Sequence, residues 1–205
     1  MSRRITIALL AVLLVAASAA AVWWWTRAEE PRAASFSGVP TSVVYAPIDS
    51  RRSDAAPLTL GEVFGPGTER LAAGPAALVR DAPAEELADC GEVLWGAPAD
   101  GCTQVMRAAY TSEDGNIAGQ FLIFNLADGR AADALVAALA KDAFVRQAAS
   151  FDPARSRAQA RALGHYVTVS WIGPVPGRAA TDLARPQIAL DTLGAVVQNR
   201  VLRAG

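Results

Sequence analysis

The feature that most constrains this chain is an uncharged segment of 21 residues, 5–25, near its N-terminus. A helix rises about 1.5 Å per residue, so a segment of this length matches the thickness of a bilayer's hydrocarbon core. Trp23, Trp24 and Trp25 end the segment, and tryptophan prefers the layer between lipid and water. The sequence therefore predicts a transmembrane helix over 5–25, with the lipid bilayer as its partner and three membrane-interface tryptophans.

Charge at the two ends of this segment predicts its orientation. Arg3 and Arg4 precede it, whereas the arginines that follow are accompanied by acidic residues. Because positive flanks stay in the cytoplasm, we expect a cytoplasmic N-terminus and an extracellular C-terminal domain in the cell membrane. A cleaved signal peptide and a secreted product are the alternative, with small-residue cleavage motifs at 17–19 and 19–21. A twin-arginine signal is a third possibility.

Composition divides the chain of 205 residues into three parts: a stub and anchor at 1–26, an extracytoplasmic linker at 27–57 and an exported domain at 58–205. The linker is polar, small and proline-bearing. Lys141 is the only lysine, an arginine bias that is typical of bacterial genomes rich in GC. The net charge of −1 gives no general attraction to nucleic acid.

The two cysteines, Cys90 and Cys102, are an even number in a domain expected to be exported. That combination predicts a disulfide, which would close a short loop. Two buried free thiols are the alternative. A metal site is less favoured, because two cysteines and one histidine show no recognisable ligand spacing.

Strand patterns occur at 103–112, 117–126 and 164–172. The Asp114-Gly115 pair between the first two predicts an antiparallel hairpin, which the third strand joins. The segment 117–126 is apolar at nearly every position, so we expect it to be central and covered on both faces.

Helical patterns occur at 59–64, 83–95, 129–141 and 181–203, and no element is assigned to 142–161. The predicted fold class is α+β. It consists of an N-terminal transmembrane helix and a small antiparallel-rich sheet, the hairpin plus a third strand, packed against two to three helices.

The sequence predicts no catalytic, metal-binding or cofactor-binding residue and no cofactor. His165 is the only histidine, and on one strand it points away from the face that carries Ser170. No serine lies in a nucleophile motif. The acidic groups at 85–89 and 113–114 are explained by a helix start and a turn. Whether the protein is an enzyme stays open, and we lean against it.

Arg155, Arg157 and Arg161 form the one basic cluster of the domain. Such a cluster is either a solvated surface or a contact for an anionic partner such as a wall polymer or a lipid headgroup. No aromatic residues are interleaved with it, so nucleic acid is not expected.

We therefore expect a single-pass, membrane-anchored extracytoplasmic domain that serves as a binding, interaction or sensory module of the bacterial cell envelope. Its partner would be an unknown envelope protein or a cell-wall component. One alternative is an envelope hydrolase with an unrecognised active site around His165, and another is a structural subunit of a membrane complex. The second alternative would expose an apolar patch of more than a few hundred Å².

Overall fold

A computed structural model of the chain describes residues 30–74, 77–96, 101–179 and 182–204. The chain divides into two compact units, Met1–Glu30 and Pro31–Gly205, and the second unit contains the sheet and helices of the fold. Residues 31–57, which were predicted to belong to a linker, contribute a strand and a 3-10 helix to this unit.

No helix within the described residues is long and apolar enough to cross a bilayer. This finding corrects the predicted fold class, which included a transmembrane helix, and the predicted single-pass localisation. Both predictions rested on the segment 5–25 and on Trp23, Trp24 and Trp25, which lie outside the described residues.

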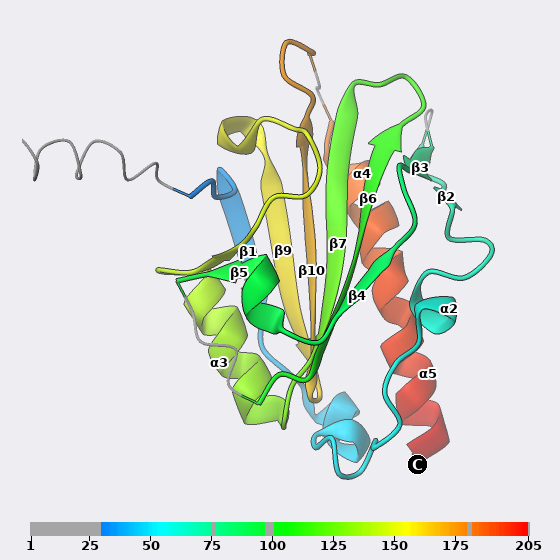
Figure 1. The fold of residues 1–205 in the computed structure, drawn as a ribbon, viewed down its shortest axis with the longest axis vertical. Coiled ribbons are helices and arrows are strands. Elements are labelled where there is room, and N and C mark those ends of the chain that lie inside the picture. The colour runs from blue at the N-terminus through cyan, green and yellow to red at the C-terminus, as the bar shows by residue number, and fades with distance from the viewer. Residues whose placement is uncertain (1–29, 75–76, 97–100, 180–181, 205) are drawn as a thin grey trace, which may run out of the picture. The chain divides into compact units, whose positions relative to one another are not determined.

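The predicted three-stranded sheet is also wrong, because the described residues form a mixed sheet of eight strands (Figure 1). Seven strands lie side by side, and β4 (Glu85–Leu87) also pairs with β6. Their order across the sheet is β1 (Ser35–Val39), β9 (Arg157–Leu163), β10 (Tyr166–Pro174), β7 (Ile117–Asn125), β6 (Gln104–Ser112), β3 (Leu78–Arg80) and β2 (Arg70–Leu71). β1 runs parallel to β9, and the other pairs are antiparallel. A separate pair joins β5 (Leu94–Trp95) to β8 (Phe144–Val145).

Helices cover both faces of the main sheet. The α-helices of the described residues are α2 (Leu60–Val63), α3 (Gly129–Leu139), α4 (Ala184–Asp191) and α5 (Ala195–Ala204). Short 3-10 helices are η1 (Val43–Ile48), η2 (Cys90–Val93), η3 (Pro153–Arg155) and η4 (Thr192–Gly194). Figure 1 shows α3 alongside β1 and β9, and α4 and α5 on the other side of the sheet.

Alternation along the central strands explains this layering. In β10, Val167, Val169 and Trp171 join the apolar cluster under α3. Tyr166 and Ile172, which point the opposite way, join the cluster under α4 and α5. β7 is buried from Ala118 to Asn125, as its continuous apolar sequence predicts for a strand covered on both faces.

The predicted hairpin is confirmed, since β6 and β7 pair antiparallel with Gln104 opposite Asn125. The third predicted strand joins the same sheet by pairing with β7. The predicted helix at 83–95 is wrong. Glu85–Leu87 pairs with β6, and the Asp89 side chain accepts a hydrogen bond from the Gly91 backbone N–H at 2.8 Å. Pairing with β6 and this local turn are therefore more favourable for this segment than the predicted helix.

The sheet is larger than predicted because segments without a clear pattern join it. β9 comes from the unassigned stretch 142–161 and β1 from the predicted linker. The predicted final helix, 181–203, is divided into α4 and α5 by η4.

The predicted disulfide is confirmed. Cys90 and Cys102 are bonded, with their Cα atoms 6.3 Å apart. Cys90 is buried beneath the α3 layer, and the bond ties η2 to the start of β6.

We predict that replacing both cysteines by alanine lowers the free energy of unfolding by about 3 kcal/mol, because a loop of this length is no longer closed in the unfolded chain. Urea unfolding of the double variant, and of the wild type with a reductant, measures the effect. The two should agree. A loss below about 1 kcal/mol would show that the bond does not limit the unfolded chain.

Candidate functional site

One part of the main sheet is left open on the side of α4 and α5. In β9, Ala158, Ala160 and Ala162 face α3, so Arg157 and Arg161 point to the opposite side. α4 lies over β10 and β7, and β9 is next to β10 at the border of that cover. The side chains that β9 directs to this side therefore lie beside α4 and not beneath it.

A hollow of about 310 Å³ lies at this border. Apolar and aromatic surface comes from Tyr45 of η1, Leu163 of β9 and Ile188 of α4. Polar groups are spaced between them. The full lining is Tyr45, Arg161, Leu163, Thr168, Ile188, Asp191, Thr192, Gly194, Ala195 and Gln198. Apolar walls with a few polar groups are the usual composition of a small-ligand site.

Arg161 is the cationic group of this hollow. Its Nε atom is buried and has no hydrogen-bond partner among the described residues. None of the ion pairs that the described residues form includes the Arg161 guanidinium. A half-buried charge without a bonded partner is costly, so this position favours the approach of an anion.

Asp191 lies in the same hollow but is bonded elsewhere. The Ser170 hydroxyl donates to Asp191 Oδ1, and Gln187 Nε2 donates to the Ser170 oxygen. Burial raises the pKa of Asp191, although these hydrogen bonds and the charges of Arg161 and Arg157 act in the opposite direction. Asp191 and Arg161 thus interact through their charges, whereas the hydrogen bond to Asp191 Oδ1 comes from Ser170.

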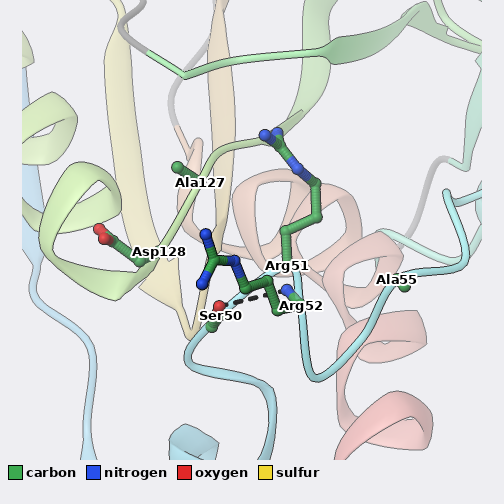
Figure 2. Close-up of a pocket in the computed structure, with 6 residues that line it drawn as sticks. All are labelled: Ser50, Arg51, Arg52, Ala55, Ala127 and Asp128. Atoms are coloured by element: carbon green, nitrogen blue, oxygen red, sulfur yellow. Dashed lines mark hydrogen bonds between the residues drawn. The ribbon is translucent and has the colours of Figure 1, made fainter.

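A second hollow, of about 680 Å³, lies between the turn that follows η1 and the loop before α3 (Figure 2). It is lined by Ser50, Arg51, Arg52, Ala55, Ala127 and Asp128. Figure 2 shows the two arginine side chains extending in different directions, Arg51 away from Arg52 and Arg52 toward the side of Asp128. This hollow contains two guanidiniums, and none of the described residues that line it is aromatic or a large aliphatic.

A third hollow, of about 450 Å³, borders an ion network that is already complete. Arg200 donates to Asp54 Oδ1 at 2.9 Å and to both Glu62 oxygens at 3.1 Å. The Tyr166 hydroxyl donates to the other Asp54 oxygen at 2.8 Å. Burial, and then the Asp54 carboxylate, raise the pKa of Tyr166, so the phenol stays protonated. This network ties α5 to the segment before α2.

His165 lies beneath η1 and is fully buried. Its Nδ1 atom is 2.8 Å from the Ile48 carbonyl oxygen, and since a carbonyl only accepts, Nδ1 carries the hydrogen. The Nε2 atom has no partner among the described residues. Burial lowers the pKa of His165, against the hydrogen bond to Ile48 and the charge of Asp54. The ring is therefore neutral and inaccessible to a substrate.

The structure separates the three arginines that the sequence grouped. Arg155 forms an ion pair with Asp152 at 2.8 Å on η3. Arg157 and Arg161 lie on one side of β9, and the charges of both act to lower the pKa of Asp191. Ser170 and His165 are not brought together, because Ser170 contacts Asp191 and Gln187 on the α4 side.

The acidic groups weighed in the sequence are bonded within the fold. Glu85 pairs with Arg107 at 2.6 Å, and Glu86 accepts from Gln104 at 2.6 Å. Glu113 pairs with Arg70 across the sheet edge. Asp114 accepts from Ser112 and Asn116 within the hairpin turn. No group of three or more metal-ligating side chains occurs in the part of the chain that the structure describes.

Sequence reasoning missed Asp191 and Tyr45 as neighbours of Arg161. Tyr45 lies in a short apolar run, and Asp191 ends a weakly amphipathic helix, so neither carries a local signal. They meet Arg161 only through packing of η1 and α4 on the sheet.

Comparison with known proteins adds no family to this description: no protein-family model, curated protein or solved structure matches the chain. The geometry and charge of the hollows are therefore the basis on which a function can be proposed.

We predict that Arg200→Gln lowers the free energy of unfolding by about 3 kcal/mol, because two carboxylates in a largely buried network lose their cation. Arg203→Gln is the matched control. Arg203 lies on the same helix, is 73% exposed and reaches Glu62 only at 4.0 Å, so its loss should cost less than about 0.5 kcal/mol. Equal effects of the two variants in urea unfolding would contradict the assignment.

We predict that His165 makes stability fall in acid. The folded protein holds the ring neutral, whereas the unfolded chain takes up a proton below about pH 6.5. Stability supplied by His165 is thus present above that pH and is lost as the pH falls toward the lowered folded pKa.

His165→Asn is the matched variant, since the asparagine amide can still donate to Ile48 but does not titrate. The stability difference between wild type and variant should shrink when urea unfolding is moved from about pH 7.5 to about pH 5. A difference that stays constant would show that the ring is not held neutral by the fold.

Proposed function

We propose that this domain is a binding module for a small organic anion with an apolar body, which it takes up in the hollow around Arg161. The observation that carries the proposal is a half-buried guanidinium, without a bonded partner among the described residues, in a hollow with apolar walls. This gives the binding role expected from the sequence a definite ligand class. An envelope protein or a cell-wall component as partner remains an untested prediction.

The head of the ligand is assigned to Arg161. Carboxylate, sulfonate and phosphate oxygens match the planar fork of a guanidinium, and such charge-assisted bonds are stronger than neutral ones. Asp191 would oppose a second negative charge nearby, although its Oδ1 atom already accepts a hydrogen bond from the Ser170 hydroxyl. A ligand with one negative charge therefore fits better than one with several.

The body of the ligand is assigned to Tyr45 and Ile188, at the border of the hollow. Ile188 is 64% exposed, which is unusual for a large aliphatic side chain next to a charged hollow. Each buried methylene of a ligand contributes about 0.8 kcal/mol, so a short aliphatic or aromatic body adds affinity. The volume of about 310 Å³ holds only a small molecule.

A binding role is favoured over the hydrolase alternative by the state of the candidate groups. His165 is fully buried and bonded to a backbone carbonyl. Ser170 is 1% exposed and donates to Asp191, with no histidine beside it. A general base must reach the proton that it abstracts, and neither group is reachable from solvent.

Calorimetric titration with three probes tests the proposal. The probes are methanesulfonate, which has the head alone, 1-butanol, which has the body alone, and 1-butanesulfonate, which has both and stays charged at every working pH. We predict that 1-butanesulfonate binds at least about tenfold more tightly than methanesulfonate, because three methylenes contact the apolar wall and full burial of all three would give about fiftyfold. Butanol should show no measurable binding.

Two variants of β9 give the control. Arg161→Gln should weaken 1-butanesulfonate binding at least about tenfold, as expected for loss of a charge-assisted bond. Arg157→Gln removes the same charge from the same side of the same strand, but Arg157 does not line the hollow. It should weaken binding by less than about threefold. Equal losses would mean that general charge, and not this hollow, attracts the probe.

A further inference from the structure

The hollow in Figure 2 lies on a different part of the molecule and has a different chemistry. Its two cations come from the turn that follows η1. That turn is fixed by its own bonds: the backbone N–H groups of Ser53 and Asp54 donate to the Ser50 carbonyl, and the Arg52 N–H donates to the Ser50 hydroxyl oxygen. The two guanidiniums are therefore presented by a rigid piece of backbone.

The turn is also fastened to the opposite wall. The Arg51 N–H donates to the Ala127 carbonyl at 3.0 Å, and the Gly129 N–H donates to the Asp49 carbonyl at 2.7 Å. A Cβ atom at Gly129 would lie 2.0 Å from Asp49 Oδ1, so a larger residue there would displace the Asp49 side chain. Close backbone contact thus sets the width of the hollow.

The Arg51 side chain is held in place by hydrogen bonds. Its Nη1 atom donates to the Gly101 carbonyl and to the Thr103 hydroxyl oxygen, each at 2.8 Å. These bonds use one nitrogen of the guanidinium and keep the group at the rim. A cation held this way loses little conformational entropy when it binds an anion.

The carboxylates beside these arginines are bonded elsewhere. Asp128 caps α3 by accepting from the Ala131 N–H at 2.9 Å, and Asp54 belongs to the Arg200 network. The side chain of Arg52 forms no hydrogen bond or ion pair with any residue that the structure describes. Both arginines line the same hollow, so an anion that enters it is attracted by two cations.

We propose that this hollow is a second site, which binds a phosphate monoester group or inorganic phosphate between Arg51 and Arg52. Two cations favour a doubly charged group over the singly charged head assigned to the Arg161 hollow. Tetrahedral oxygens can accept from both guanidiniums at once. No aromatic or large aliphatic side chain is among the described residues that line this hollow, so recognition is of the phosphate and not of the body attached to it.

The same chemistry could come from a soluble phosphate or from a lipid headgroup, and two arms separate these sources. The first arm is calorimetric titration of the full-length protein with inorganic phosphate. The second is sedimentation with phosphatidylcholine vesicles, with and without phosphatidic acid, which carries a phosphate monoester. Each arm compares the wild type with Arg52→Gln and Arg178→Gln.

Arg52→Gln is expected to fold normally, since that side chain forms no bond with the residues that the structure describes. Arg178 is the matched control: it is exposed, it does not line the hollow, and none of the ion pairs of the described residues includes it. We expect Arg52→Gln to weaken phosphate binding at least about tenfold and Arg178→Gln by less than about twofold. A loss seen only with phosphatidic acid vesicles would assign the site to a lipid phosphate.

Absence of an Arg52-dependent loss in both arms, or an equal loss in the two variants, would overturn the proposal. The result is independent of the Arg161 hollow. Arg52→Gln should leave 1-butanesulfonate binding unchanged, and Arg161→Gln should leave phosphate binding unchanged. Failure of one site is therefore distinguishable from failure of the other.

Discussion

The burial of β7 and β10 on both faces is the constraint on which the rest of this structure depends. These strands place apolar side chains on two sides of one sheet, so each side needs its own cover. α3 covers one side, and α4 with α5 covers the other. Because α4 is centred on β10 and β7, the flank of that second cover meets β9. Arg161 lies at that border. The hollow forms there because the layer of α4 and α5 is narrower than the sheet that it covers.

Arg200 of α5 and Arg161 beside α4 differ in how their charges are balanced by neighbouring groups. Arg200 is 7% exposed and contacts Asp54, Glu62 and two backbone carbonyls, so its desolvation is offset by bonds. Arg161 has Asp191 nearby, but that carboxylate is bonded to Ser170. Removing a partner of Arg200 therefore lowers the stability of the fold, whereas supplying an anion to Arg161 stabilises the complex with that anion. This contrast separates a structural cation from one that is available to a ligand.

Local patterns in the sequence predicted the pieces that local physics decides. Asp114-Gly115 predicted the hairpin, and the helical pattern at 129–141 predicted α3. The pairings that enlarge the sheet had no such signal. β9 alternates arginine and glutamine with alanine rather than large apolar residues, and its parallel partner β1 lies far away in the chain. Arg161 was singled out with Arg155 and Arg157, but only the fold shows that Arg155 is tied to Asp152 while Arg161 lines a hollow.

The role proposed for Arg161, as the group that takes an anion, is tested most directly by a crystal structure of the protein grown with 1-butanesulfonate. We predict sulfonate oxygens within about 3.2 Å of the Arg161 guanidinium, with the butyl chain against Tyr45 and Ile188. A sulfonate bound elsewhere, with Arg161 instead joined to Asp191 in a direct ion pair, would contradict this role.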